Sequence, residues 1–457
     1  MKRLGLERTG LLLILIGYLI LAVAYNVRTP AWQAPDEPAH YNYIAQIVAD
    51  GCCPIIEPGD WDSAYLARLT SSHFAPEMLG QLDMLEYEDH QPPLYYLLAS
   101  VIFRLTDGNI TVLRLFSTLL GGVAIVLTYG VGKALYPKRI PVALGAAAFV
   151  AFIPQHIAIL SSINNDSLAE VVIAAAMLTA VLYLRYGRIP VWLIGVIVGL
   201  GLVTKVNTLL LVGVIPAGFV LRWWFARRHD SQSYPTGRLV RDILVFFVPV
   251  LLIASVWVTR NISVYGFPDV FGLGAHNAVV ADQARTADLI AQIGIGNYFR
   301  RALETTFISF WGQFGWMELP LTGWMVAVIL ILIGIVMLGW IVSLIPAPRP
   351  ATNSTTHAAV DDRRAVWGML ILLFIAAVTQ YIYYNAEFWQ LQGRYLYAGL
   401  IPLALAVSLG LDGWGRLLVG FDKSSGFRWW AQLPILVLIP LNLFLLWRVI
   451  PALAFVS

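Results

Sequence analysis

The chain has 457 residues, of which 59% are hydrophobic and only 12% are charged, and its mean hydropathy is +0.72. This composition leaves too little polar surface for a soluble protein of that length and predicts a polytopic membrane protein. The net charge is only +3 and the basic residues are dispersed between apolar stretches, which excludes the concentrated basic face of a nucleic-acid-binding protein.

Apolar runs long enough to cross the hydrocarbon core recur along the whole chain. They predict an all-α fold, a polytopic transmembrane helix bundle of about 11 spans. The predicted spans are 9–27, 114–133, 140–160, 166–184, 189–204, 207–225, 242–259, 321–345, 366–384, 395–415 and 431–453.

The first apolar run has two interpretations. Lys2, Arg3 and Arg8 precede it and small residues end it near Ala24, as in a cleaved signal peptide. Because so many further spans follow, we expect a retained anchor, and cleavage would leave the orientation of the other spans unchanged.

The distribution of basic residues predicts the orientation. With the N-terminus in the cytoplasm, one side of the membrane receives most of the Lys and Arg but few of the Asp and Glu, which is the positive-inside pattern. The basic residues on that side are Lys133, Lys138, Arg139, Arg185, Arg188, Arg227, Arg228, Arg238, Arg241, Arg363, Arg364, Arg416, Lys423 and Arg428.

The apolar segment 92–106 tests this topology. It is short for a crossing and carries Arg104 near its end. If it crossed, every later loop would change sides and the charge pattern would invert. We therefore expect a helix at the outer interface.

Two large loops are predicted outside, at 28–111 and 260–320. Within the second, Phe299, Leu303 and Phe307 recur at helical spacing opposite charged residues, which predicts an amphipathic helix on the membrane. The inner segments 226–240 and 346–364 are rich in polar residues and Pro, which is typical of flexible connectors. Function is therefore expected on the outer face.

Asp36 and Glu37 form an adjacent carboxylate pair directly after the first span. Exposed acids beside a membrane indicate chemistry at its surface. The alternative is structural: Asp36 caps a helix starting at Pro38, and Glu37 favours its dipole.

A second acidic cluster precedes a double proline. His90 could shuttle a proton or bind a metal together with Asp89, and the alternative is a solvated acidic loop. Asp60 and Asp62 have the spacing of a metal-nucleotide motif, which we interpret as chance. The neighbouring Cys52 and Cys53 are expected to be free thiols rather than a vicinal disulfide.

Several motifs in order resemble the integral-membrane GT-C glycosyltransferases. They are PDEPAHYNYIAQI from Pro35, DHQPPLYYLL from Asp89, SSINNDSLA from Ser161, GLVTKVNTLLL from Gly201 and LQGRYLYAGLIP from Leu391. Within that superfamily the chain is most similar to bacterial relatives of the dolichyl-phosphate-mannose protein mannosyltransferases and of the aminoarabinose lipid A transferase. The likeness covers the first two hundred or so residues and returns near 392–402.

This resemblance implies a single integral-membrane domain over 1–457 and a hexosyltransferase. Such an enzyme moves a sugar from a polyprenyl-phosphate carrier to a hydroxyl acceptor on a protein, lipid or polysaccharide at the extracytoplasmic face, with inversion. By motif match, Asp36 is the expected general base and Glu37 the second choice. Relatives often carry Lys where this chain has Gln91, so that phosphate contact is in doubt.

Cations are needed near the leaving phosphate. Arg394 is the first candidate because QGRY matches the motif, and Lys205, Arg260, Arg300 and Arg301 follow, with helix-end anchoring as the alternative for each. Three further residues are expected to contact sugar or acceptor: Asn165, Asp166 and Gln392. Asp166 has an alternative role as the cap of the helix beginning at Ser167.

Two other classes of protein stay open. A transporter or lipid flippase would also be an apolar bundle, but it should carry ionisable residues near the midplane and broken helices in two halves. A non-catalytic envelope-assembly protein would need no carboxylates, histidine and cations on one face. The sequence requires no cofactor, and a divalent metal remains an option at Asp89 and His90.

Overall fold

The computed structural model describes residues 2–229, 234–344, 358–421 and 427–455, and most of these residues are helical, with only two short strands. The expected all-α membrane fold is confirmed. In chain order the elements are α1 (Lys2–Arg28), α2 (Glu37–Ala49), α3 (Ser63–Ser71), η1 (Pro76–Met84), α4 (Leu94–Thr106), α5 (Ile110–Leu135), α6 (Ile140–Phe152), α7 (Pro154–Leu160), α8 (Asp166–Tyr186), α9 (Val191–Leu202), η2 (Val206–Leu209), α10 (Leu210–His229), α11 (Thr236–Tyr265), α12 (Leu273–Val279), α13 (Thr286–Ile293), α14 (Ile295–Trp311), β1 (Gln313–Phe314), β2 (Leu319–Pro320), α15 (Trp324–Ser343), α16 (Ala358–Glu387), η3 (Gly393–Gly399), α17 (Leu400–Phe421), α18 (Phe427–Trp430), η4 (Leu433–Val437), α19 (Leu438–Phe444), η5 (Leu445–Val449) and η6 (Ile450–Leu453).

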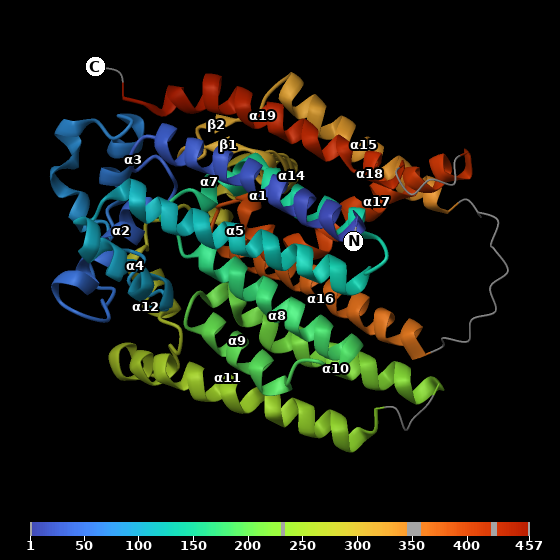
Figure 1. Cartoon of the computed structure of the whole chain (residues 1–457). Helices are drawn as coiled ribbons and strands as arrows, with labels where there is room; N and C mark the ends of the chain where they lie inside the picture. Colours follow the sequence, from blue (N-terminus) through green and yellow to red (C-terminus); the bar gives the residue numbers. More distant parts are fainter. Residues whose placement is uncertain (1, 230–233, 345–357, 422–426, 456–457) are drawn as a thin grey trace.

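The long helices lie side by side and form an elongated bundle (Figure 1). Within the described residues, nine helical segments are long and apolar enough to cross a membrane. Helix α6 lies inside this bundle and is buried on nearly all sides, as expected for a helix that is apolar all round.

Two predicted spans differ from straight crossings. The span expected at 140–160 is a pair, α6 and α7, bent by 67°. Ile153 between them has an extended backbone and Pro154 follows, because proline disfavours helical geometry in the preceding residue. The span expected at 189–204 contains only the 12-residue α9, which at ~1.5 Å per residue is shorter than the ~30 Å hydrocarbon core.

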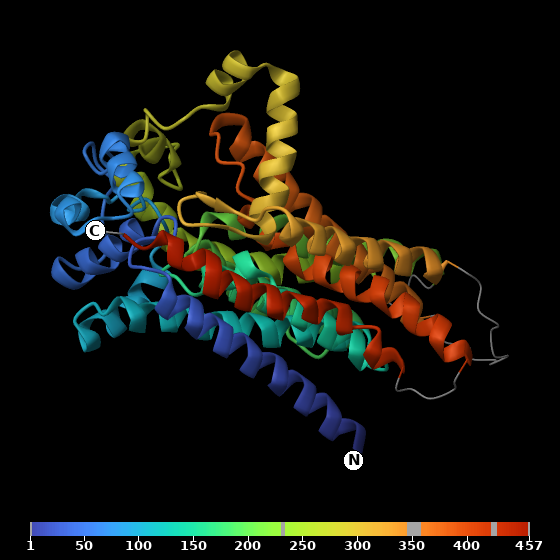
Figure 2. The same cartoon turned by 90° about the horizontal axis from the view of Figure 1, so that it is seen from above.

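The two large loops gather at one end of the bundle, whereas the N-terminus lies at the other (Figures 1 and 2). The first loop carries α2, α3, η1 and α4, and α4 is an apolar helix of 13 residues, too short to span. The second loop carries α12 and α13, then α14, which runs across the long helices in Figure 2. Phe299 and Leu303 on α14 are exposed, as the amphipathic pattern predicted.

Candidate functional site

Asp36 lies between α1 and α2 in the left-handed region, with φ 65° and ψ −1°. This conformation is uncommon for residues other than glycine, although Asp tolerates it better than most. The side chain makes no capping hydrogen bond to α2, so the structural alternative of a helix cap is wrong. Instead, Oδ2 pairs with Nη2 of Arg394 and Oδ1 accepts a hydrogen bond of 3.1 Å from the Tyr87 hydroxyl.

The charge of Asp36 is set by this pairing. Burial raises the pKa of its carboxyl, but the guanidinium of Arg394 and the nearby His40 outweigh burial and hold the pKa below its ordinary value. Asp36 is therefore an ionised carboxylate at neutral pH.

Arg394 reaches Asp36 because η3 packs closely against α14. A Cβ atom at Gly393 would lie 2.4 Å from the backbone nitrogen of Phe310, so only glycine permits this approach. The Arg394 side chain is 5% exposed, and its Nε and Nη1 have no hydrogen-bond partner. Buried donors without a partner are rare in folded proteins, so these two nitrogens could hold a bound group only by donating hydrogen bonds to its oxygens. The QGRY motif thus places a buried guanidinium, with two nitrogens that no protein group satisfies, beside the carboxylate.

An open cavity of about 270 Å³ adjoins this pair. Aromatic side chains from the two large loops and from α16 and η3 form much of its wall. The lining residues are Pro35, Asp36, Trp61, Leu66, Tyr87, Glu88, His276, Val280, Gln283, Trp316, Met317, Tyr384, Gln390, Gln392 and Tyr395. A cavity with many aromatic faces and a few convergent polar groups is typical of a small-molecule site.

Glu37 points the other way, into the protein. It is fully buried and forms a bidentate pair with Arg114, at 2.7 Å to Nε and 2.6 Å to Nη2. Its carboxylate also accepts the backbone N–H groups of Trp32 and Ile163. All of its strong acceptor directions are occupied, so this environment favours a positioning role, and we do not retain Glu37 as a base.

Arg114 extends the same network. It donates to the backbone oxygens of Asn26, Thr29 and Pro30 at 2.8, 2.7 and 3.0 Å. One ion pair therefore joins the end of α1, the start of α2, the start of α5 and the turn before α8. The network fixes the backbone on both sides of Asp36.

A second polar layer lies behind Asp36. Asp166 pairs with Lys205 at 2.7 Å rather than capping α8, and Asn164 accepts the backbone N–H of Asp166 at 2.8 Å. Asn165 is buried and donates to the Tyr96 hydroxyl at 3.2 Å, which in turn contacts Nδ1 of His40 at 2.9 Å.

His40 connects this layer with the Asp36 pair. Burial lowers the pKa of His40 to about 3, and the charges of Asp36, Lys205, Asp166 and Arg394 all influence it. The predicted residues Asp166 and Lys205 are thus close to the site, although neither lines the cavity.

His90 lies beside the cavity but is buried. Its Nδ1 is 3.1 Å from the backbone oxygen of Tyr87, and its ring contacts that of His276 at 4.2 Å between centroids. Burial lowers the pKa of His90 well below the ordinary value, so the ring is neutral. Burial also raises the pKa of the neighbouring Glu88, to about 8.

Of two other predicted binding residues, one lines the cavity and the other does not. Gln392 lines the cavity and donates to Gln390 at 2.9 Å. Arg260 does not line it: its guanidinium contacts the backbone oxygens of Cys53 and Pro54 and the Tyr265 hydroxyl. In the structure Cys52 and Cys53 are joined by a disulfide, so the expectation of free thiols is wrong.

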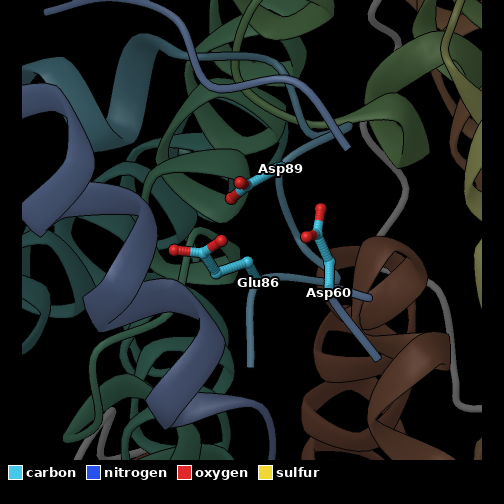
Figure 3. A group of neighbouring side chains, drawn as sticks. All are labelled: Asp60, Glu86 and Asp89. Atoms are coloured by element: carbon cyan, nitrogen blue, oxygen red, sulfur yellow. The ribbon is translucent and has the colours of Figure 1, made fainter. Parts of the chain in front are cut away.

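The metal prediction needs a correction. In the part of the chain that the structure describes, the acidic group able to hold an ion consists of Asp60, Glu86 and Asp89, whose ligand atoms lie within 4.8 Å of one another (Figure 3). His90 is not a member. The Asp60 to Asp62 spacing is not a two-acid metal motif, since Asp62 caps α3 by accepting the backbone N–H of Tyr65 at 2.8 Å.

Sequence reasoning missed most of the cavity wall. Tyr87 stands inside the acidic segment that was recognised, but nothing in its spacing indicated a contact with Asp36. Trp61 and Tyr87 meet edge to face at 5.0 Å, and Trp316, which lies between β1 and β2, also lines the cavity. Loop folding, which leaves no periodic signal, brings these residues together.

Comparisons with known proteins agree with the motifs over part of the chain. The model of the family described as dolichyl-phosphate-mannose-protein mannosyltransferase matches residues 90–253. Among solved structures, the chain is similar to the crystal structure of ArnT from Cupriavidus metallidurans bound to undecaprenyl phosphate, with 14% identity, a TM-score of 0.49, and coverage of 97% of this chain and 73% of that one. No curated protein matches. Over residues 90–253 the chain is thus similar to the family that its motifs predicted.

Proposed function

We propose that this protein is a glycosyltransferase that moves a sugar from a polyprenyl-phosphate carrier to a hydroxyl acceptor. The observation that carries the proposal is the pairing of Asp36, which lines an aromatic-walled cavity, with the buried Arg394, which does not line it. The family match over residues 90–253 supports the reaction class. A hexose is the sugar we infer from that resemblance.

The reaction we propose is a direct displacement at the anomeric carbon. Asp36 takes the proton of the acceptor hydroxyl as its oxygen bonds to that carbon, and the bond to the carrier phosphate breaks. The free Nε and Nη1 of Arg394 bind the phosphate and stabilise its charge, with Lys205 nearby. A single displacement inverts the configuration. Aromatic rings such as Trp61 and Trp316 offer apolar faces to a sugar.

We further propose that the site is extracytoplasmic. The charge pattern of the loops supports this orientation, with the N-terminus in the cytoplasm. The first loop, which carries several residues of the cavity wall, lies at the end of the bundle opposite the N-terminus, which agrees with it. A carrier whose tail stays in the bilayer then presents its sugar to a cavity at the end of the helices.

The test is transfer by the purified protein in nanodiscs. Radiolabelled polyprenyl-phosphate sugars are incubated with cell-envelope protein, lipid and polysaccharide fractions in turn. We expect label to leave the carrier and appear in one fraction. Label that stays on the carrier in every combination would contradict the proposal.

One observation bears on the transporter alternative. Within the bundle, Nε2 of His156 contacts Glu170 at 2.6 Å, and its Nδ1 lies 2.8 Å from the backbone oxygen of Val150. Ionisable residues inside a membrane bundle often mark transport paths. Both ring nitrogens of His156 are occupied by these contacts. A flux assay in liposomes with the labelled carrier separates the two functions.

Replacing Arg394 with Ala is expected to raise the KM for the donor by about 10-fold or more and to lower kcat, because the phosphate loses its charged hydrogen bonds. Donor titration of the transfer rate measures both constants. Arg68→Ala, at an exposed position on α3, is the control and should leave both unchanged. An unaltered donor dependence in the Arg394 variant would remove this residue from phosphate binding.

The pH dependence of the rate reports on Asp36. Its lowered pKa means that the wild-type base stays ionised well below neutrality, so Asp36 causes no loss of rate between about pH 7 and pH 5. In Arg394→Gln the guanidinium is gone but burial remains, so the pKa rises. The fall of the transfer rate at acidic pH should therefore begin at a higher pH in Arg394→Gln than in wild type. If the rate falls at the same pH in both proteins, the result would argue against the pairing of Asp36 with Arg394.

A further inference from the structure

Three acidic side chains from two segments of the first loop meet beside the cavity. Asp60 precedes α3, whereas Glu86 and Asp89 lie between η1 and α4, and their carboxylates converge in Figure 3. The two segments are also joined through the backbone, where the N–H of Glu86 donates to the oxygen of Asp60 at 3.0 Å. The convergence is thus built into the fold of the loop.

Asp89 gives independent evidence for a ligand. It is 1% exposed, its Oδ2 accepts a hydrogen bond from Gln46 at 2.8 Å, and its Oδ1 has no partner. No ion pair among the described residues includes any of the three acids. A buried carboxylate without a cation or a full set of donors is costly, so a missing positive partner is expected here.

We propose that Asp60, Glu86 and Asp89 bind one calcium ion. All the donors are oxygens, as hard cations prefer, and there is no thiolate or imidazole in the group. The ligand atoms lie within 4.8 Å of one another, a spread that one Ca²⁺ ion can bridge because oxygens at about 2.3–2.6 Å from it can stand up to about 5 Å apart, whereas the bonds of Mg²⁺, at about 2.0–2.1 Å, bridge a smaller spread. Backbone oxygens or water complete the coordination.

The ion would hold two walls of the cavity together. Trp61 follows Asp60 and Tyr87 follows Glu86, and their rings meet at 5.0 Å. The Tyr87 hydroxyl contacts Asp36. Calcium binding does not depend on the transfer reaction. Its effect on activity rests on the proposed function: the ion would hold Tyr87 in position against Asp36.

Terbium luminescence tests the site in the full-length protein without any substrate. Tb³⁺ replaces Ca²⁺ in oxygen sites, and the indole of Trp61 beside Asp60 should sensitise its emission. We expect saturable emission that Ca²⁺ displaces at lower concentration than Mg²⁺. Asp89→Asn and Glu86→Gln should weaken Tb³⁺ binding by about 10-fold or more, and the exposed Glu77→Gln, in η1, should leave it unchanged.

Thermal unfolding supplies a readout that does not depend on emission. At saturating Ca²⁺ the wild-type midpoint should rise by about 3 °C over its value in EDTA, and that of Asp89→Asn should not. In EDTA, Asp89→Asn should unfold no earlier than wild type because it removes repulsion between the acids.

Three results would overturn the proposal: emission that Ca²⁺ does not displace, equal Tb³⁺ affinity in wild type and Asp89→Asn, or displacement by Mg²⁺ at the same concentration as Ca²⁺. Each leaves the transferase proposal standing, since the assays contain neither donor nor acceptor.

Discussion

Replacing Asp36 with Asn is expected to lower the rate of sugar transfer by about 10²- to 10⁴-fold, the range for removal of a general base. The amide keeps the size of the side chain but cannot accept the proton of the acceptor hydroxyl. Because Asp36 makes no capping hydrogen bond, α2 should keep its start, but the buried Arg394 loses its ionised partner and the variant should lose some stability. Single-turnover transfer of label from the carrier measures the effect.

Asp50→Asn is the matched control, since Asp50 is an exposed acid at the other end of α2. It should retain the wild-type rate, and both variants should elute as folded protein. A wild-type rate in Asp36→Asn would remove this carboxylate from the mechanism.

Replacing Glu37 with Ala is expected to destabilise the protein by about 3–5 kcal/mol, because Arg114 is left as an uncompensated buried charge. Glu37 and Arg114 are 0% and 3% exposed, so solvent cannot screen the loss. Membrane proteins often unfold irreversibly, and the half-life of folded protein at raised temperature is then the measurement. We expect that half-life to shorten sharply.

A double variant tests the origin of this effect. Glu37→Leu combined with Arg114→Leu removes both charges, and it should be more stable than Glu37→Ala alone. Half-lives that are equal for wild type and Glu37→Ala would contradict the network described around α2.

The fold was largely predictable because a lipid environment demands long apolar helices. Composition and run length identified the bundle, and charge asymmetry gave a consistent orientation. The bend at Pro154 was visible in principle, since proline disfavours helix at Ile153, but the apolar run continues without interruption. Helix α9 shows a second limit of sequence-based prediction, because the helix is shorter than the apolar run that predicts it.

The site was predictable only where motifs carry the information. Asp36 and Arg394 are 358 positions apart in the sequence. The predicted topology places both on the same side of the membrane, but it does not predict that they are in contact. Nothing in the sequence indicates that Glu37 pairs with Arg114, because Arg114 stands at the start of a predicted apolar span. The group of Asp60, Glu86 and Asp89 depends on a loop with no periodicity, so only tertiary folding reveals it.

The most direct test of the transferase proposal is the structure of the protein in nanodiscs with a polyprenyl phosphate bound. We predict phosphate density within hydrogen-bonding distance of Nε and Nη1 of Arg394, with the Asp36 carboxylate facing the cavity on the same side of the bilayer. Phosphate bound elsewhere, with those two nitrogens still without a partner, would contradict it.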